Sequence, residues 1–487
     1  VNLNREIEKI FVSTTFDDFF VRPQKSVVVT RKEVDLTMPL SRNIKISLPM
    51  IAANMDTVAE GEMMKAMSLE GAFAFLHRNC PIEKQVDMVR YVKRQHSFVI
   101  ENPLKIHAEA AIAEAQSITE SHKISGLLVE TAPGSGVLAG ILSNRDMRNG
   151  TGSPNAKVEE FMTANEKLIT GYPNMDMEEA EKIMRENKIE KLPLVYEGGQ
   201  IAGLITMKDL RLAQQKPYSS KDKKGKLLAG AAIGATGEYL ERAYELINAG
   251  ADCIVIDIAH GHSAVMETAI KNFRAKFGEV ELICGNVATA EGAKFLLDLG
   301  VDGIKVGIGP GKGCRTRLET GFGVPQLQAI REAYLAIGDE VPIISDAGIN
   351  YDKDIFLAIA CGASTIMSGG IFSGTDESPG QIIEDPSTGQ KFKFYRGMTS
   401  PEAVIAGTYD ENEVAEKLST PAEGLSKKIP YIGPVGNILK RIKGHLQSAV
   451  SYSGEKTLAD ARAKIAREPA KYLTRLTQAS RKESFER

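Results

Sequence analysis

A strand, a helix and a second strand are encoded in order by residues 281–306, ELICGNVATAEGAKFLLDLGVDGIKV. The apolar runs at its two ends, 281–284 and 303–306, have the length and composition of buried strands. Between them, ATAEGAKFLLDLG has helical spacing and stops at a glycine, which is typical of a helix C-terminus. A helix that joins two such strands predicts a parallel βαβ unit.

The same alternation extends over most of the chain. Further apolar runs at 253–256, 341–344 and 365–367 are each followed by a loop with glycine or aspartate, and two more precede residue 100, in LPMIAANM and GAFAFLH. The run at 253–256 follows YLERAYELINAG, in which Gly250 is expected to end a helix. So many βα units in series favour an α/β fold closed as a (β/α)8 TIM barrel over an open sheet. In such barrels the functional residues lie in the loops that follow the strands.

Residues 101–213 interrupt this rhythm with an internal repeat. ISGLLV at 124–129 followed by GILSNRD at 140–146 recurs as KLPLV followed by GLITMKD. The pattern resembles a tandem pair of CBS motifs (a Bateman domain), which often binds adenine or guanine nucleotides; the alternative is a structural insert without a ligand. We therefore expect residues 1–100 to form the first part of the barrel, 101–213 a tandem CBS regulatory domain, and 214–487 the second part of the barrel.

The composition is that of a soluble globular protein, with 43% hydrophobic and 25% charged residues and a formal net charge of −3. This balance argues against a dedicated nucleic-acid binder. No apolar run approaches the roughly 20 residues that span a bilayer, and the first residues, VNLNREIEKIF, lack a signal-peptide pattern. We therefore expect a cytoplasmic protein without a membrane partner. Five cysteines without CxxC spacing argue against a disulfide framework and a zinc site.

The most informative loop is GIGPGKGCRTRLETGFGVPQ, residues 307–326, which follows the strand expected at 303–306. Four glycines precede its single cysteine, Cys314, and glycine lets backbone groups approach a ligand closely. Nearby cations would favour the thiolate of a nucleophilic cysteine; the alternative is an ordinary thiol in a flexible loop. The cations are Lys312, Arg315 and Arg317. Three of the other cysteines lie in apolar or small-residue contexts, which indicate the core; they are Cys253, Cys284 and Cys361. The context of Cys80 is compatible with either a core or a functional role.

Several ordered motifs resemble the IMP dehydrogenase/GMP reductase family. They are IAANMDTV, VIDIAHGHS, GNVATAEGA, GIGPGKGCRTR, SDAGI, SGGIFSGTDESPG and YRGM. The resemblance implies an NAD(P)-linked oxidoreductase whose loop cysteine attacks carbon 2 of a purine 5′-monophosphate and forms a covalent adduct. It also implies a homotetramer or octamer, and a monovalent cation such as potassium held by loop carbonyls, here those of Gly309, Gly311 and Cys314.

The resemblance further implies a role for each matching residue. Cys314 would be the nucleophile, Thr316 a hydroxyl that relays a proton, and Glu423 a catalytic carboxylate near the base. Asp346 would accept from the ribose hydroxyls, and glycines would offer backbone N–H groups to the phosphate, although each glycine taken singly is equally compatible with a tight turn. The residues expected at the nucleotide are Asn54, Met55, Asn286, Lys312, Asp346, Gly348, Gly369, Gly370, Tyr395, Gly397 and Met398. Those expected at the nicotinamide cofactor are Asp257, Ala259 and His260.

Two enzyme classes share this apparatus. IMP dehydrogenase passes a hydride to NAD⁺ and then hydrolyses the adduct to XMP, for which the family supplies an Arg-Tyr pair on a mobile flap. GMP reductase expels ammonia from GMP and accepts a hydride from NADPH, so it needs no hydrolytic base. The flap is expected near residues 397–433, which contain no arginine; Tyr409 follows Thr408 there. Loss of a base typically costs about 10²–10⁴-fold in rate, and this favours the reductase.

Other features point in both directions. Asn54, Gly370 in place of a serine, and His77-Arg78 resemble the reductases; YRGM, TDESPG and the CBS pair resemble the dehydrogenases. Lys312 replaces a serine common to both. We expect a GMP reductase that makes IMP and ammonia with NADPH or NADH, and a regulatory purine nucleotide at the CBS pair. The alternatives are an IMP dehydrogenase, which would use NAD⁺, and a catalytically silent nucleotide sensor.

Overall fold

The structure is a computed structural model that describes residues 9–95, 99–122, 124–149, 155–173, 175–222, 225–408, 419 and 421–485. The chain divides into two units, and each is described by itself. Unit 1 comprises residues 1–95, 218–222 and 227–487, and unit 2 comprises residues 96–217 and 223–226.

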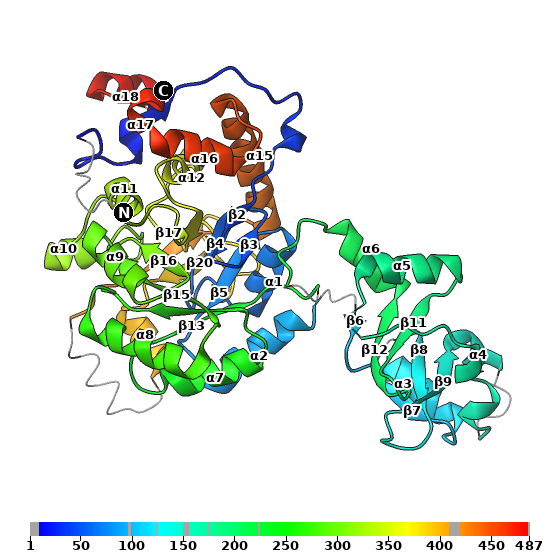
Figure 1. Ribbon diagram of the computed structural model, residues 1–487. Helices are drawn as coiled ribbons and strands as arrows, with labels where there is room; N and C mark the ends of the chain where they lie inside the picture. Colours follow the sequence, from blue (N-terminus) through cyan, green and yellow to red (C-terminus); the bar gives the residue numbers. More distant parts are fainter. Residues whose placement is uncertain are drawn as a thin grey trace. The chain divides into compact units, whose positions relative to one another are not determined.

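Unit 1 is built on a closed barrel of eight parallel strands (Figure 1). Around the barrel they follow the order β13, β14, β15, β16, β17, β18, β4, β5. Their bounds are β4 Met50–Ala52, β5 Phe73–Leu76, β13 Gly230–Ile233, β14 Cys253–Asp257, β15 Glu281–Val287, β16 Gly303–Val306, β17 Ile343–Asp346 and β18 Thr365–Ser368. The predicted TIM barrel is confirmed.

A helix follows each barrel strand, and these helices surround the barrel (Figure 1). They are α1 Gly61–Leu69, α2 Ile82–Lys93, α7 Tyr239–Asn248, α8 Ala264–Phe277, α9 Ala290–Asp298, α11 Gln326–Ile337, α12 Asp352–Ala360 and α15 Val435–Ser453. Local signals set their ends: the Thr289 hydroxyl accepts from the Gly292 amide before α9, and Gly250 has a φ of 100° after α7, as N-caps and glycine C-termini require.

Strand β16 contributes a buried cation next to the apolar cluster of the barrel interior. The interior cluster includes Phe73, Phe75 and Val255, all buried. Because strand side chains alternate, Lys305 lies on the same face of β16 as Gly303, and its side chain is buried as well.

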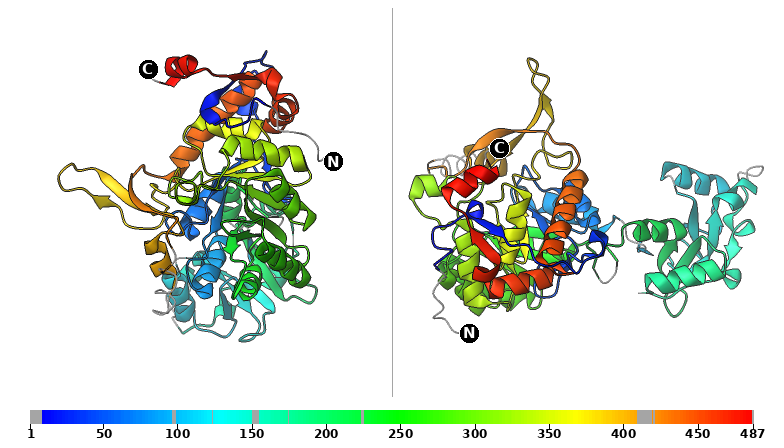
Figure 2. Two further views of the ribbon diagram at one scale, coloured as in Figure 1. Left: turned by 90° about the vertical axis from the view of Figure 1, so that its left-hand side faces the viewer. Right: turned by 90° about the horizontal axis from the view of Figure 1, so that it is seen from above.

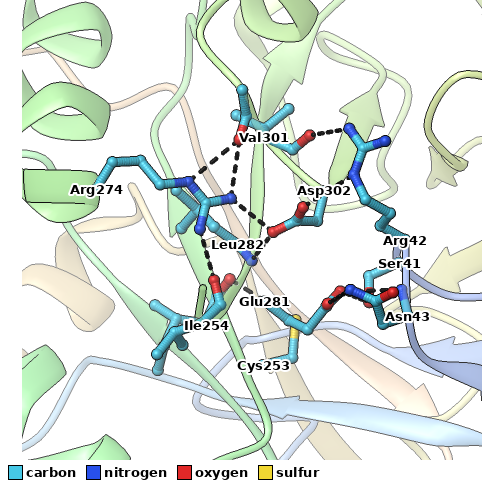
Figure 3. Close-up of polar contacts among 12 residues, drawn as sticks. Ser41, Arg42, Asn43, Cys253, Ile254, Arg274, Glu281, Leu282, Val301 and Asp302 are labelled. Carbon is cyan, nitrogen blue, oxygen red and sulfur yellow. Dashed lines mark hydrogen bonds and ion pairs between the residues drawn. The ribbon is translucent and has the colours of Figure 1, made fainter. Parts of the chain in front are cut away.

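The N-terminal end of the barrel is closed by a short hairpin and a polar cluster. The hairpin consists of β2 Met38–Pro39 and β3 Lys45–Ile46. Figure 3 shows its turn: the Ser41 hydroxyl donates to Glu281, and Arg42 donates to Asp302, which also accepts from Arg274 at 2.6 Å. In TIM barrels this end serves stability, and the opposite end serves chemistry.

Unit 1 also carries an antiparallel extension after β18. Strands β19 Ile383–Glu384, β20 Lys391–Arg396 and β21 Ser426–Pro430 form a sheet that projects from the barrel in yellow to orange (Figure 2). Helix α13, Pro401–Gly407, follows β20, with Ser400 as its N-cap and proline at its first position. The remaining elements of this unit are β1 Phe19–Val21, α10 Thr316–Thr320, α16 Leu458–Arg467, α17 Pro469–Tyr472, β22 Leu473–Arg475, which pairs with β1, and α18 Gln478–Phe485.

Unit 2 consists of two halves that correspond to the sequence repeat. In each half an antiparallel strand pair leads into a helix: β8 and β9 into α4, and β11 and β12 into α6. Each half has its own apolar cluster, and a third cluster around Leu128, Leu138 and Leu204 joins them. The elements are β6 Val99–Ile100, β7 Lys105–His107, α3 Ile112–Ser121, β8 Gly126–Glu130, β9 Leu138–Ser143, α4 Asn144–Asn149, β10 Thr163–Ala164, α5 Met177–Glu186, β11 Lys191–Val195, β12 Ile201–Thr206 and α6 Met207–Gln215.

Three strands differ from the sequence expectation by more than one residue. Strand β15 continues to Val287 rather than ending at residue 284. Strand β17 covers residues 343–346 rather than 341–344, because Pro342 has no amide hydrogen to donate to a ladder. Strand β13, with the sequence GAAI, was not predicted as a separate strand, since glycine and alanine have low β propensity. Among the described residues, no helix combines the length and the apolarity needed to cross a membrane.

Candidate active site

The residues expected at the site gather at the C-terminal ends of the barrel strands. Asp257 and Asp346 are the last residues of β14 and β17, and Asn54 and Gly369 follow β4 and β18 within a few residues. The cysteine loop begins directly after β16 at Gly307, whose φ is 144°. A Cβ atom there would lie 2.5 Å from the Asp346 carbonyl oxygen, so only glycine fits. These positions share the catalytic end of a TIM barrel.

Cys314 lies next to a hydroxyl and a carboxylate. Its Sγ is 3.2 Å from Oγ1 of Thr316, and Thr316 donates to Oε2 of Glu423 at 2.6 Å. A hydroxyl has one hydrogen, so when Thr316 donates to Glu423 the thiol must be the donor to Thr316. The geometry therefore provides a proton path from the thiol to the carboxylate.

Backbone hydrogen bonds hold this arrangement in place. The Arg315 amide donates to the Glu423 carbonyl at 2.7 Å, and the Leu425 amide donates to the Gly313 carbonyl at 3.1 Å. The Gly397 amide donates to the Leu425 carbonyl at 3.1 Å. This hydrogen bond joins the start of the expected flap to the segment around Glu423. The segment around Glu423 thus lies against the cysteine loop as a short antiparallel ladder.

The two arginines of the cysteine loop make their polar contacts elsewhere. Arg315 pairs with Glu319 at 2.5 Å, and Arg317 donates to the Ile308 carbonyl at 2.9 Å. The side chain of Lys312 is exposed, and its Cδ would lie 3.3 Å from a Cβ at Gly370. Within the described part of the chain, the Thr316 hydroxyl is the side-chain group that forms a hydrogen bond with the Cys314 sulfur.

Lys305 joins two of the expected ligand-binding carboxylates, and sequence reasoning missed it. Its Nζ is 2.9 Å from Oδ1 of Asp257 and 2.9 Å from Oδ2 of Asp346. Burial acts to lower the pKa of Lys305, but the two carboxylates outweigh burial and raise it. Burial acts to raise the pKa of Asp257, and Lys305 together with the Asn54 amide lowers it. The lowered pKa keeps Asp257 ionised at neutral pH.

Asn286 adds a buried amide to this group. Its Nδ2 donates to the Gly307 carbonyl at 2.7 Å and to Oδ2 of Asp346 at 2.9 Å. Its Oδ1 is buried and has no hydrogen-bond partner among the described residues. A buried acceptor without a donor is costly, so this atom suits the hydroxyl or N–H group of a bound molecule.

Tyr395 and glycines form the other side of the site. The tyrosine is buried, and burial, with smaller contributions from Asp346 and Cys314, raises its pKa to about 12. A Cβ at Gly369 would lie 2.7 Å from Sδ of Met55 and 3.1 Å from the Tyr395 hydroxyl, and one at Gly397 would lie 2.5 Å from the Gly313 carbonyl. Gly348 has a φ of 80°. These positions require glycine for close packing or for backbone conformation.

Asp56 links the site to the start of the expected flap. It forms an ion pair with Arg396 at 2.7 Å, and its amide donates to Sδ of Met398 at 3.5 Å. Asn79 donates both to Asp56 and to the Ala403 carbonyl of α13. Arg396 is thus engaged in a structural ion pair.

The other sequence-predicted residues are placed as follows. Ala259 and His260 lie exposed in the loop after β14. Cys253, Cys284 and Cys361 are buried, as is Cys80, whose pKa burial raises to about 11, so all four belong to the core. Tyr409 lies outside the described residues.

A TIM barrel with a thiol, a hydroxyl and a carboxylate in contact at its C-terminal end defines a class of barrel enzymes with a loop cysteine. The model of the IMP dehydrogenase / GMP reductase domain matches residues 13–486, and the chain belongs to this family. At the level of the family it is a purine-nucleotide oxidoreductase.

Named relatives come from both branches of the family. The chain is 42% identical to inosine-5′-monophosphate dehydrogenase of Nitrosopumilus maritimus (strain SCM1), over 91% of this chain and 93% of the relative. It is 41% identical to the enzyme of the same name from Aquifex aeolicus (strain VF5), over 98% and 96%. Among solved structures, a cysteine-to-alanine variant of Trypanosoma brucei GMP reductase with guanosine 5′-monophosphate superposes with a TM-score of 0.82 at 37% identity, covering 96% of each chain.

Proposed function

We propose that this protein is a GMP reductase, which converts GMP to IMP and ammonia with NADPH or NADH. The observation that carries the proposal is the contact from Cys314 through Thr316 to Glu423, in a chain whose segment 397–433 contains no arginine. The site offers a path for a proton to or from the sulfur, and the sequence lacks the arginine that the family uses to activate water.

The reaction has two covalent steps at carbon 2 of the purine. In the first, the Cys314 thiol passes its proton through Thr316 to Glu423, the sulfur attacks carbon 2, and the protonated carboxylic acid returns a proton to the departing amine. Ammonia leaves, and the purine stays bound to sulfur. In the second, a hydride adds to carbon 2 and the carbon–sulfur bond breaks, which gives IMP and leaves Cys314 as a thiolate that takes up one proton from solvent to restore the thiol. A reduced nicotinamide cofactor supplies this hydride when it is bound.

The residues around Cys314 suit a purine 5′-monophosphate. Asp346, which pairs with Lys305 at 2.9 Å, would accept from the ribose hydroxyls, and Asn286 would offer its unpartnered oxygen. The backbone at Gly348, Gly369 and Gly370 would receive the phosphate. Tyr395, Gly397 and Met398 would cover it, Lys312 would lie beside it, and Asn54 and Met55 would complete the base pocket.

The cofactor side of the site is built around Asp257. This carboxylate is 26% exposed at its side chain and held ionised by Lys305, so it retains capacity to accept from a ribose hydroxyl. Ala259 and His260 lie exposed in the loop that follows it. We infer that these three residues hold the nicotinamide nucleotide.

IMP dehydrogenase is the second candidate, because curated relatives above 40% identity carry that name. It would need another base for the attacking water. Of the lysines in segment 397–433, Lys427 and Lys428 are described and Lys417 lies outside the described residues; an ordinary lysine is protonated at neutral pH and is a poor base. Lys427 departs from this, because burial and the nearby Lys312 lower its pKa, and it is the described lysine of the segment that a dehydrogenase could use as the base. A silent nucleotide sensor is a weaker candidate, because the contact between Cys314, Thr316 and Glu423 is intact.

A paired assay separates these candidates. The full chain is given GMP with NADPH or NADH in one reaction, and IMP with NAD⁺ in the other, while absorbance, ammonia and XMP are followed. We expect oxidation of the reduced cofactor with stoichiometric ammonia, and XMP formation at least about 10²-fold slower, as expected without a base. XMP formation without ammonia release would identify a dehydrogenase, and no change in either reaction would identify a sensor.

Three further features are proposed from the family resemblance. A potassium ion would be held by carbonyls of Gly309, Gly311 and Cys314, as carbonyl oxygens hold this ion elsewhere; the fit is partial, since the Gly311 carbonyl already accepts from the Cys314 amide. Unit 2 would bind a regulatory purine nucleotide; a solved Trypanosoma brucei GMP reductase, 34% identical with a TM-score of 0.73, is described in complex with guanosine 5′-triphosphate. The assembly would be a homotetramer or octamer.

A further inference from the structure

A cationic pocket lies beside the glycines expected at the phosphate. It has a volume of about 340 Å³ and is lined by Lys312, Gly370, Tyr395, Lys427 and Lys428, with apolar residues completing its wall. No carboxylate is among the described residues that line it. The lining therefore carries positive charge that no lining acid balances, which favours an anionic occupant.

Lys427 is held at this pocket by defined contacts. It lies on β21 opposite Tyr395 of β20, its ammonium donates to the Lys312 carbonyl at 2.9 Å, and it is 5.9 Å from the centre of the Tyr395 ring. Burial and then the like charge of Lys312 lower its pKa. A bound anion would offset both effects, because an opposite charge favours the protonated ammonium.

The pocket adjoins the catalytic site through two shared residues. Tyr395 borders Gly369 on one side and the pocket on the other. Lys312 lies two positions before Cys314 in the chain, and its aliphatic stem lies against Gly370. A nucleotide whose base reaches Cys314 and whose phosphate reaches Gly369 and Gly370 would thus present its phosphate to the pocket. This step rests on the proposed nucleotide substrate, but not on the direction of the reaction.

We propose that Lys427, together with Lys312, binds the 5′-phosphate of the purine nucleotide and selects by charge for a phosphate dianion. The lysines would add charge-assisted hydrogen bonds to a site otherwise formed by backbone amides and a tyrosine hydroxyl. Lys427 is then a specificity-determining residue that acts at the end of the nucleotide remote from the reacting carbon.

The test measures binding, so it does not depend on turnover. The parent protein is the full chain carrying Cys314→Ala. Dissociation constants for GMP, IMP and guanosine are determined by calorimetry for this parent, for the parent with Lys427→Gln, and for the parent with Lys427→Arg. Lys391→Gln is the matched control, because this exposed lysine of the neighbouring strand β20 lies outside the pocket lining and its loss changes the net charge equally. Melting temperatures establish that each variant is folded.

We expect Lys427→Gln to raise the dissociation constants for GMP and IMP by about 10- to 100-fold, which is the range for a lost hydrogen bond to a charged group. Guanosine binding should be unchanged, Lys427→Arg should retain most of the affinity, and Lys391→Gln should behave as the parent. Unchanged nucleotide binding in folded Lys427→Gln would overturn the proposal, as would an equal loss for guanosine. Since GMP and IMP share the phosphate, the result stands even if the paired assay identifies a dehydrogenase.

Discussion

The hydroxyl of Thr316 donates to the carboxylate of Glu423 at 2.6 Å, although 107 positions separate the two residues in the chain. The contact is supported by backbone hydrogen bonds between the loop of Cys314 and the segment around Glu423. A side chain remote in sequence is therefore a fixed neighbour of the thiol. This relation makes Glu423 the acid–base group of the proposed reaction.

Replacing Glu423 by glutamine should separate proton transfer from binding. The amide oxygen of Glu423→Gln can still accept from Thr316, but the side chain can no longer take up the thiol proton or protonate the departing amine. We expect the rate of ammonia release to fall about 10²–10⁴-fold, with the dissociation constant for GMP nearly unchanged. Single-turnover ammonia release and calorimetry measure the two quantities.

Glu384→Gln is the control for this variant, because Glu384 is an exposed carboxylate of β19 and its loss removes the same charge. It should retain full activity. If Glu423→Gln turned over at the rate of the control, the carboxylate would have no part in proton transfer.

Removing the nucleophile should abolish turnover and leave the fold intact. Cys314→Ala deletes one half-buried sulfur from a loop whose backbone hydrogen bonds do not involve the side chain. We expect less than about a hundredth of the wild-type rate, since loss of a nucleophile costs more than loss of one acid–base group. Steady-state cofactor oxidation and GMP calorimetry are the readouts; a larger residual rate would mean that the sulfur does not form the adduct.

The sequence was sufficient for the barrel because its evidence is local and repeated. The strand expected at 303–306 coincides with β16, since a four-residue apolar run between a helix and a glycine loop leaves few alternatives. Residues 230–233 were not recognised as a strand because glycine and alanine have low β propensity. Glycine is needed there for packing, since a Cβ at Gly230 would lie 2.6 Å from the Phe73 ring. Tertiary contact, not propensity, places that strand.

The site was predictable only where a motif or a loop pattern marked it. The contact of Cys314 with Thr316 follows from their spacing, but Lys305 was missed, because a lysine within GIKV is equally compatible with an exposed strand face. Its burial follows from barrel closure, which brings Asp257 and Asp346 to either side of it. Long-range charge pairing of this kind leaves no signal in a single sequence.

Lys305→Met should destabilise the barrel by about 3–5 kcal/mol, because it leaves two carboxylates that are largely buried without their counter-ion. The pKa of Asp257 is lowered in the folded state, so its ionised form contributes stability above the ordinary pKa of aspartate and loses that contribution as the pH falls. The variant lacks this contribution. We therefore expect the difference in unfolding free energy between parent and variant to be greatest at neutral pH and to narrow below about pH 4.

Urea unfolding across this pH range measures the effect. Lys294→Met is the control, since Lys294 pairs with Asp298 on the surface of α9 and its loss should cost less than about 1 kcal/mol. Equal costs for the two variants, or a difference independent of pH, would mean that the buried pair contributes no more than a surface ion pair.

Deleting residues 96–217 and joining the ends should leave a folded, active barrel that no longer responds to purine nucleotides. Both ends of the remaining chain are anchored on unit 1: Lys93 pairs with Asp222 at 2.8 Å, and the Ser220 amide donates to the Ser68 carbonyl at 2.8 Å. The ion pair brings the two ends close together, so a short glycine–serine linker from Gln95 to Tyr218 can replace the inserted unit without strain. The contacts among Cys314, Thr316 and Glu423 all lie within unit 1. Turnover of the deleted chain should therefore match that of the full chain without effector, whereas added GTP or ATP should change the rate of the full chain alone.

A soluble product that still responds to these nucleotides would place the regulatory site on the barrel, and inactivity with every linker length would show that unit 1 depends on unit 2.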